Sequence, residues 1–273
     1  MIEIIRTGVN ADRARVVLFD FDGTISTIRS GWMEVMIPMM VEILAETKSG
    51  ETDEQLRLVV EEFVGRLTGK QTMYQMIELA ENVAKRGGTP EDPVAYKRRY
   101  LDLLWHKIEH RIEELRQGAS PEKYLVPGSR ELLENLRDRG YKMYLASGTD
   151  EVYMKEEARL LDVTKYFAGV HGALDDYKSF SKSILIQRII SSAEFRGDEF
   201  LGFGDGYVEI ENVKQVGGVT VGVATAEPEC LTVDEWKRTR LVGVGADFIV
   251  PNYLKCEELM GTLFTNGVAV RNL

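Results

Sequence analysis

Several features that many proteins contain are scarce in this chain of 273 residues. It has two cysteines, Cys230 and Cys256, which are too few for a disulfide framework and favour a reducing compartment. No uncharged apolar run approaches the roughly 18 residues that cross a membrane. Charged residues interrupt the apolar ones among the first 15 positions, so no secretion signal is predicted there. The sequence therefore predicts a cytoplasmic protein that does not enter a membrane.

Positive charge is also in short supply. Lys and Arg number 34 against 44 Asp and Glu, which gives a formal net charge of −10 at pH 7. Nucleic acids and anionic membrane surfaces are bound by basic faces, so we expect neither as a partner. A local basic pocket for a small anion is still compatible with this balance. No feature of the sequence indicates a particular oligomeric state.

Apolar runs typical of buried strands alternate with segments of helical period. Near-continuous apolarity indicates a parallel sheet that is covered on both faces. The predicted strands are 15–21, 141–147, 199–205, 219–225 and 246–250, and the predicted helices between them are 129–140, 150–162, 181–195 and 207–217. This alternation predicts an α/β fold with a doubly wound, Rossmann-like parallel sheet.

One long stretch after the first strand lacks any strand pattern. Residues 26–124 have helical period throughout, broken only by short turn-forming segments. We therefore expect two domains, an α/β core formed by 1–25 and 125–273 and an inserted all-helical domain formed by 26–124. The inserted domain is expected to lie over the carboxyl edge of the sheet.

Polar residues follow three of the predicted strands. Asp20 and Asp22 end the first strand, Ser147 ends the second, and Asp205 follows the third between two glycines. Ligands of open α/β sheets bind beyond the carboxyl ends of the strands. Two neighbouring acids at a buried strand end are costly to ionise, so a positive partner is expected beside them.

Four motifs in order resemble the haloacid dehalogenase superfamily. They are DFDGT (20–24), LASGT (145–149), FSKSIL (180–185) and FGDGYVE (203–209). The resemblance covers a little over half of the chain, in the predicted α/β parts, and the helical insertion is similar to that family's C1-type cap.

The resemblance implies a nucleophile, a proton donor and a metal site. Asp20 would take up a phosphoryl group as an aspartyl phosphate, and Asp22 would protonate the leaving oxygen and then deprotonate the attacking water. Mg²⁺ would be held by the Asp20 carboxylate, the Asp22 backbone carbonyl and Asp205. Lys182 would supply positive charge beside Asp20; Lys178 is the competing candidate for this role.

The resemblance also implies the groups around the phosphate. The Ser147 hydroxyl and backbone amides, including that of Gly148, would bind phosphoryl oxygens. The Thr24 hydroxyl is expected at the same site, where it could orient Asp22. Arg29, close to the first motif, is expected to bind substrate through a second anionic group, with a solvated surface arginine as the alternative. Glu209 is expected to act indirectly, or to be an ordinary acid of a helix first turn.

These residues predict a Mg²⁺-dependent phosphatase that acts on a small phosphorylated metabolite, such as a sugar phosphate. One alternative is a phosphomutase, which uses the same aspartyl phosphate but transfers it to a substrate hydroxyl. The other is a non-catalytic module that binds metal or phosphate. The motifs do not distinguish the first two functions.

Overall fold

The computed structural model describes residues 2–174, 181–192 and 195–265. In this part of the chain a seven-stranded sheet has the order β1-β7-β6-β5-β2-β3-β4. The strands are β1 (Glu3–Ile4), β2 (Val16–Phe19), β3 (Lys142–Asp150), β4 (Gly169–Ala173), β5 (Phe200–Gly204), β6 (Val219–Val223) and β7 (Phe248–Val250). Five of the six neighbouring pairs are parallel, and only β1 runs antiparallel, to β7. The predicted α/β class with a parallel sheet is confirmed.

The sheet reverses its winding direction beside β2. The chain adds β3 and β4 on one side of β2, whereas β5, β6 and β7 extend the sheet on its other side. Phe19, the last residue of β2, is in register with Leu145 of β3 and Phe203 of β5. The residues just beyond these three positions therefore meet at the carboxyl edge, which is where α/β sheets bind ligands. β3 itself continues to Asp150, three residues beyond the predicted end of this strand, so Ser147 lies within it.

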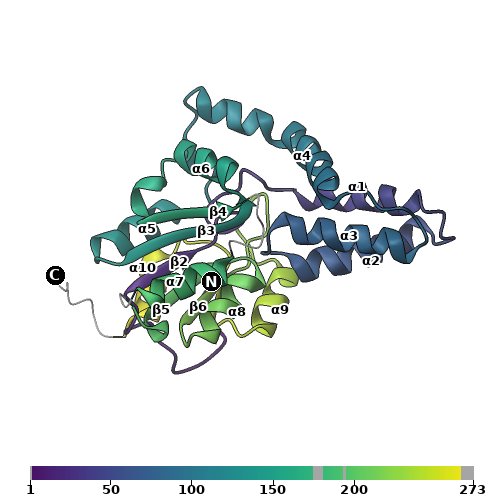
Figure 1. Cartoon of the computed structure of the whole chain (residues 1–273). Coiled ribbons are helices and arrows are strands. Elements are labelled where there is room, and N and C mark those ends of the chain that lie inside the picture. The colour runs from purple at the N-terminus through teal and green to yellow at the C-terminus, as the bar shows by residue number, and fades with distance from the viewer. Residues whose placement is uncertain (1, 175–180, 193–194, 266–273) are drawn as a thin grey trace.

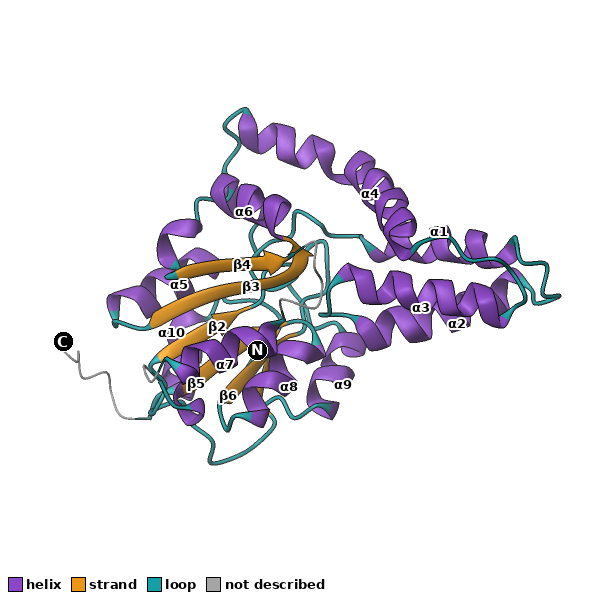
Figure 2. Cartoon of the chain, in the orientation of Figure 1, coloured by secondary structure: helices purple, strands orange, loops and turns teal. Residues whose placement is uncertain are grey.

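Helices cover both faces of the sheet (Figures 1 and 2). In β2, Val16 and Leu18 pack in a cluster with apolar residues of α7 (Lys182–Ser191) and α8 (Tyr207–Gln215). Val17 and Phe19 belong to the larger core on the opposite face, to which α5 (Ser129–Asp138), α6 (Glu151–Leu160) and α10 (Cys256–Leu263) contribute. Because successive strand residues point to opposite faces, a strand apolar at every position is buried on both sides.

The predicted strands and helices were found, and in the described part of the chain two strands and two α-helices were not predicted. These are β1, β4, α9 (Glu235–Gly243) and α10. The sequence of β4, GVHGA, contains two glycines and a histidine and so has little strand propensity. Its pairing with β3, in register at Tyr144 and Gly169, supplies the hydrogen bonds that keep it extended. No helix of the described residues has both the length and the apolarity that a membrane crossing requires.

The insertion consists of four helices, α1 (Met33–Ala45), α2 (Asp53–Leu67), α3 (Thr72–Lys85) and α4 (Pro93–Arg116), at the right and top of Figure 1. Their limits follow local signals. Thr52 and Gln55 form a capping box at the start of α2, and Asp92 caps α4, which begins with Pro93. The buried face of α4 repeats about every fourth residue, as expected for an amphipathic helix: Tyr96, Tyr100, Leu104, Ile108 and Ile112.

The chain leaves and re-enters the α/β part through two segments that lie side by side. The Thr27 amide donates to the Tyr124 carbonyl at 2.9 Å, and the Val126 amide donates to the Ile25 carbonyl at 2.9 Å. We propose that the two domains meet at this pair, with limits at 1–25, 26–124 and 125–273.

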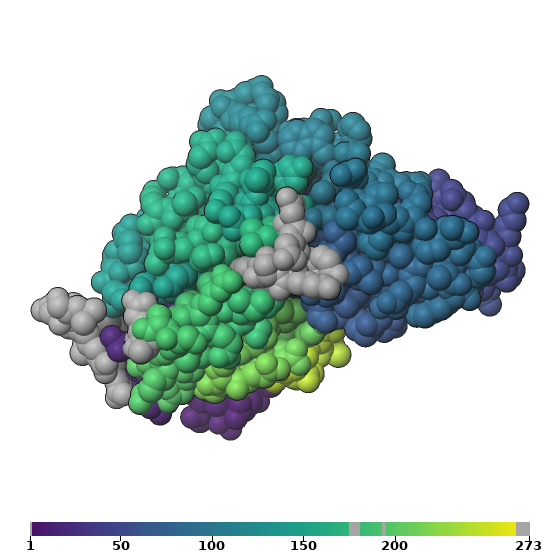
Figure 3. Space-filling model, in the orientation of Figure 1, coloured from purple at the N-terminus to yellow at the C-terminus, as the bar shows by residue number. Residues whose placement is uncertain are grey.

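Polar contacts join the insertion to the α/β part on two sides. The Lys97 ammonium on α4 lies 2.5 Å from Asp150 Oδ1 at the end of β3. On the other side, Arg240 of α9 donates to the Gly65 carbonyl of α2, and Figure 3 shows blue atoms of the insertion against yellow-green atoms of this region. The arrangement is therefore one in which the insertion is closed over the sheet edge.

Candidate functional site

Asp20 directly follows β2 and forms a buried ion pair. Its Oδ1 lies 2.6 Å from the Lys182 ammonium, and the carboxylate and the ammonium are 7% and 3% exposed. Lys182 is the first residue of α7, which Ser181 caps by accepting from the Ile184 amide. The same ammonium pairs with Glu209 of α8, whose side chain is fully buried. One lysine thus neutralises carboxylates from two neighbouring segments.

Asp22 lies on the opposite side of Asp20 and is oriented by two hydroxyl groups. Ser147 Oγ donates to Asp22 Oδ2 at 3.1 Å, and Thr149 Oγ1 donates to the same oxygen at 2.8 Å. The Thr149 amide donates to Ser147 Oγ and so orients that hydroxyl. Asp22 Oδ1 is buried and has no hydrogen bond within the described residues.

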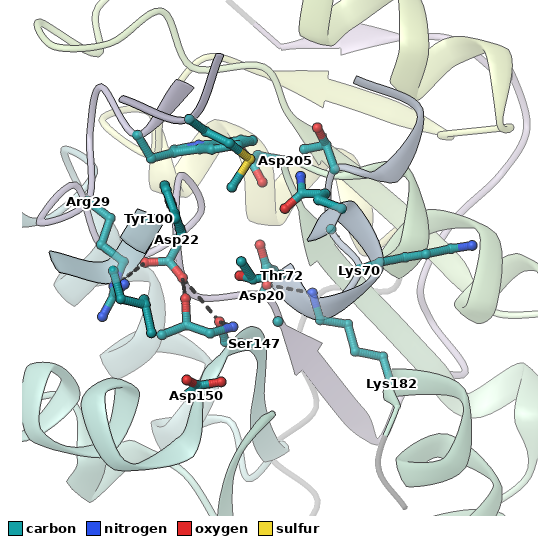
Figure 4. Close-up of a pocket in the computed structure, with 18 residues that line it drawn as sticks. Asp20, Asp22, Arg29, Lys70, Thr72, Tyr100, Ser147, Asp150, Lys182 and Asp205 are labelled. Carbon is teal, nitrogen blue, oxygen red and sulfur yellow. Dashed lines mark hydrogen bonds and ion pairs between the residues drawn. The ribbon is translucent and has the colours of Figure 1, made fainter. Parts of the chain in front are cut away.

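Arg29 forms its closest interaction with the α/β part itself. Its Nε lies 3.1 Å from both carboxylate oxygens of Glu157 on α6, and one terminal nitrogen lies 2.7 Å from Glu157 Oε1. Both side chains are more than 90% buried, and Arg29 Nε is 3.9 Å from Asp22 Oδ1. Figure 4 shows this guanidinium beside Asp22. The fork of the guanidinium is therefore already occupied by a carboxylate.

Asp205 follows β5 and approaches the first motif from the other side. Its amide donates to Thr24 Oγ1 at 3.0 Å. Gly23 has a φ of +72°, and a Cβ there would lie 2.2 Å from Asp205 Oδ2, so only glycine permits this approach. The Lys237 ammonium of α9 lies 2.9 Å from Asp205 Oδ2 and 2.9 Å from Glu227 Oε1.

These side chains line a cavity of about 90 Å³ between the sheet edge and the insertion. The α/β part contributes Asp20, Asp22, Ser147, Gly148, Lys182 and Asp205, among others (Figure 4). The insertion contributes apolar and polar residues from three helices and from the α2–α3 turn: Met36, Thr68, Gly69, Lys70, Thr72, Gln75, Tyr100 and Leu101. A Cβ on Gly148 would lie 2.6 Å from the Lys70 carbonyl, so the two parts touch at the cavity wall.

A family model for hydrolases, haloacid dehalogenase-like hydrolase, matches residues 14–217. This chain belongs to the haloacid dehalogenase-like hydrolases. The predicted family and the prediction that the protein is a hydrolytic enzyme are confirmed.

Individual relatives are more distant. A 5'-nucleotidase of Pseudomonas aeruginosa is 27% identical over 119 residues, which are 44% of this hydrolase and 54% of that protein. The match thus spans about half the length of this curated relative. A predicted phosphatase of Clostridium acetobutylicum has a similar structure, with TM-score 0.57, 18% identity and coverage of 92% and 98% of the two chains. A putative beta-phosphoglucomutase of Thermotoga maritima is also similar in structure, with TM-score 0.51, 20% identity and coverage of 91% of this chain and 98% of that one. The two structures establish the shared fold.

The pKa values of the acids in the hydrolase's cavity depend mainly on how deeply these acids are buried. Burial raises the pKa of Asp20 to about 7; Lys182 opposes this rise, and the Asp205 and Asp22 charges add to it. Burial likewise raises the pKa of Asp205 above its ordinary value, against the effect of Lys237. Burial alone would lower the pKa of Lys237, but Asp205 and Glu227 outweigh it and raise that pKa. Each of the two lysines pairs with two carboxylates, so the site holds more negative charge than its lysines compensate.

This excess predicts a pH-dependent stability of the metal-free hydrolase. Between the ordinary pKa of Asp20, 3.8, and its folded pKa of about 7, the folded state binds more protons than the unfolded state. Stability must then fall as the pH rises through this range. We expect the Tm in EDTA to be lower at pH 7.5 than at pH 5 by on the order of 5 °C, as measured by circular dichroism.

The Asp20→Asn variant is the control for this measurement, because asparagine cannot titrate. Its Tm should change less between pH 5 and pH 7.5 than that of the wild type. Added Mg²⁺ should raise the wild-type Tm most at the higher pH. A wild-type Tm that is equal or higher at pH 7.5 in EDTA would contradict the assignment of buried, uncompensated charge to Asp20.

The donor set fits a hard divalent cation. Among the described residues no three His, Cys, Asp or Glu side chains converge on one point as a metal cage. Mg²⁺, however, commonly binds through one or two carboxylates, with water and substrate oxygens completing its octahedron. Asp20 and Asp205 provide two carboxylates whose charges act on each other, and the Asp22 carbonyl belongs to the same turn. The uncompensated negative charge is the observation that favours a cation here.

Most of the predicted site residues meet at this cavity. Asp20, Asp22, Ser147, Gly148, Lys182 and Asp205 line it, and Glu209 contacts the Lys182 ammonium. Thr24 does not reach the cavity; its side chain is fully buried and accepts from the Asp205 amide, so it positions the fourth motif. Arg29 lines the cavity, and two of its nitrogens bind Glu157; its binding of a second anionic group stays a prediction. Lys178, the competing lysine, lies outside the described residues.

Sequence reasoning missed several residues that complete the site. Glu157 and Lys237 are single charged residues in amphipathic helices, with no motif around them to distinguish them from surface charges. Thr149 was within reach, because it ends the second motif only two residues after Ser147. Gln75 and Tyr100 carry only the helical periodicity of the insertion. Which of these residues face the cavity depends on how the insertion packs on the sheet.

Proposed function

We propose that the protein is a phosphatase that hydrolyses a small phosphate monoester through a phosphorylated Asp20. The observation that carries the proposal is the position of Asp20, which lies buried at the cavity wall with an ammonium on one side and a second, hydroxyl-bound carboxylate on the other. Such an arrangement suits phosphoryl transfer, which depends on positioning and on charge stabilisation.

In the first step a carboxylate oxygen of Asp20 attacks phosphorus, and the bond from phosphorus to the leaving-group oxygen breaks. The Lys182 ammonium stabilises the charge that gathers on the phosphoryl oxygens and on Asp20. Backbone amides around Gly148 donate hydrogen bonds to phosphoryl oxygens. The product of this step is an acyl phosphate on Asp20 and a leaving group that carries one added proton.

Asp22 supplies that proton and later accepts one. Ser147 and Thr149 donate to its Oδ2 and so orient the carboxyl group. When water attacks the acyl phosphate, Asp22 takes a proton from the water and Asp20 is released as a carboxylate. Each cycle thus consumes one water and restores both aspartates.

Mg²⁺ is the proposed cofactor, held by Asp20, the Asp22 carbonyl and Asp205. When bound, it would offset the negative charge of the phosphoryl group and the acids and so allow an anion to enter. Lys237 pairs with Asp205 and so helps to hold it in place. The proposed substrate is a small phosphorylated molecule, and no nucleic acid partner is proposed, in keeping with the net charge of −10.

Release of inorganic phosphate tests this proposal. We expect the purified protein to release phosphate from a generic aryl phosphate when Mg²⁺ is present. The rate should fall by at least about 100-fold in EDTA and recover when Mg²⁺ is added again. Transfer of phosphate to a second substrate hydroxyl, without release, would indicate a phosphomutase instead. No turnover with any monoester, although the ³¹P spectrum shows phosphate binding, would indicate a non-catalytic module.

A further inference from the structure

The basic residues that line the cavity are all engaged. Within the described residues they are Arg29, Lys70 and Lys182. Arg29 is bound by Glu157, and Lys182 is bound by Asp20 and Glu209. In Figure 4 the Lys70 side chain extends away from Asp20 and Asp22. Its ammonium lies 5.7 Å from the centre of the Tyr74 ring.

The insertion instead presents uncharged polar groups to the cavity. Gln75 on α3 and Tyr100 on α4 each line it and are only 4% exposed. Neither side chain makes a hydrogen bond within the part of the chain that the structure describes. Burial raises the pKa of Tyr100, so its hydroxyl stays protonated and able to donate. Both residues line the cavity, and no polar side-chain atom of either is among the fully buried atoms without a partner, so these groups are open to the cavity and can bind a ligand hydroxyl there.

Large apolar side chains also line this wall and limit the volume of the cavity. Trp32, Met36 and Leu101 line it beside the two polar side chains. The cavity volume of about 90 Å³ is small against the roughly 300–1,000 Å³ of typical ligand pockets. A nucleoside therefore does not fit in this cavity by itself, although cavities of about 240 and 360 Å³ share part of its wall. Among the described residues that line the 90 Å³ cavity, no cation is left free to bind a carboxylate or a second phosphate.

We propose that Gln75 and Tyr100 determine specificity by binding the hydroxyl groups of a small, uncharged leaving group. The substrate class is then the monophosphate of a short polyol or small sugar. This inference rests on the proposed phosphatase function and narrows it. The amide of Gln75 offers one acceptor and two donors, which matches a hydroxyl that both donates and accepts.

A matched pair of substrates tests the inference directly. Glycerol 3-phosphate and 3-phosphoglycerate have the same carbon chain, but one ends in a hydroxyl group and the other in a carboxylate. We expect kcat/KM to be at least about tenfold higher for the neutral leaving group, because a buried anion without a partner costs more than a satisfied hydroxyl. A preference for 3-phosphoglycerate, or for a nucleoside 5'-monophosphate, would overturn the inference.

Variants separate recognition from catalysis. Gln75→Leu and Tyr100→Phe should each lower kcat/KM for glycerol 3-phosphate relative to an aryl phosphate by about tenfold, because the aryl group needs no hydrogen bond. Gln75→Lys should shift the preference toward 3-phosphoglycerate by supplying a free cation. Equal losses on both substrates in all three variants would show a structural role and would reject the assignment.

The matched controls lie elsewhere in the insertion. Gln117→Leu changes an exposed glutamine after α4, and Tyr96→Phe changes a tyrosine of α4 whose hydroxyl accepts from the Glu91 amide. Both controls should keep the wild-type ratio of the two substrates. If the wild type releases phosphate from the aryl phosphate but does not prefer glycerol 3-phosphate over 3-phosphoglycerate, only the proposed role of Gln75 and Tyr100 fails. If it releases none from any monoester, the phosphatase proposal fails with it.

Discussion

The Asp20→Asn variant is expected to lose at least about 10⁴-fold in kcat while remaining folded. The carboxamide has the size of the carboxylate but is a poor nucleophile, so no acyl phosphate forms on it. It also removes a buried charge that lies close to Asp205 and Asp22. The measurement is phosphate release from an aryl phosphate at saturating Mg²⁺, together with a thermal unfolding curve of the same sample.

An exposed acid provides the control for this variant. Asp102→Asn changes a surface residue of α4 and should keep the wild-type kcat. Covalent trapping adds a second readout, because a wild-type sample quenched in acid during turnover should carry phosphate on Asp20 whereas the variant should not. If Asp20→Asn kept more than a tenth of the wild-type kcat, Asp20 would not be the nucleophile.

The second large effect is expected for Lys182→Met. Methionine retains much of the length of lysine but removes the charge that pairs with Asp20 and Glu209, both deeply buried. Removing one partner of a buried ion pair leaves uncompensated charge and costs about 3–5 kcal/mol. We expect a loss of this size in urea unfolding at pH 7.5, and a decrease in kcat of about 100-fold or more.

A second substitution distinguishes charge from packing. Glu209 is fully buried and pairs with the Lys182 ammonium, so Glu209→Gln should remove the charge left unpaired in Lys182→Met and recover part of the lost stability. The loss should also shrink at low pH, where the two carboxylates bind protons. Lys155→Met, which changes an exposed pair with Glu151, should cost less than about 1 kcal/mol. A loss in Lys182→Met that is independent of pH and of Glu209 would point to packing alone.

The positions of the principal acids could be predicted because they depend on local pattern. Strands such as β2 are apolar at every position, and a buried parallel strand must end where polar residues begin. Asp20, Ser147 and Asp205 therefore appear at strand ends in the sequence itself, and the parallel topology brings those ends together. Lys182 was predicted by the same logic, from a helix start beside the sheet edge.

Residues whose role depends on a distant partner could not be predicted in the same way. The buried pairing of Arg29 with Glu157 was not predicted, because the two residues lie 128 positions apart in the chain. Thr24 was expected to face the phosphate, whereas it accepts from the amide of Asp205, 181 positions away. No local pattern records such pairings, because they follow from packing between elements.

The sequence by itself determined the α/β class, the helical insertion and the acids at the carboxyl edge of the sheet, since periodicity and strand ends are local properties. Only the tertiary structure decided which charges are neutralised within the protein and which polar groups make no hydrogen bond within the described residues. Opposite charges far apart in the chain attract only once folding brings them together and excludes water. That packing pairs Arg29 with Glu157. It also leaves the side chains of Gln75 and Tyr100 without a hydrogen bond within the described residues.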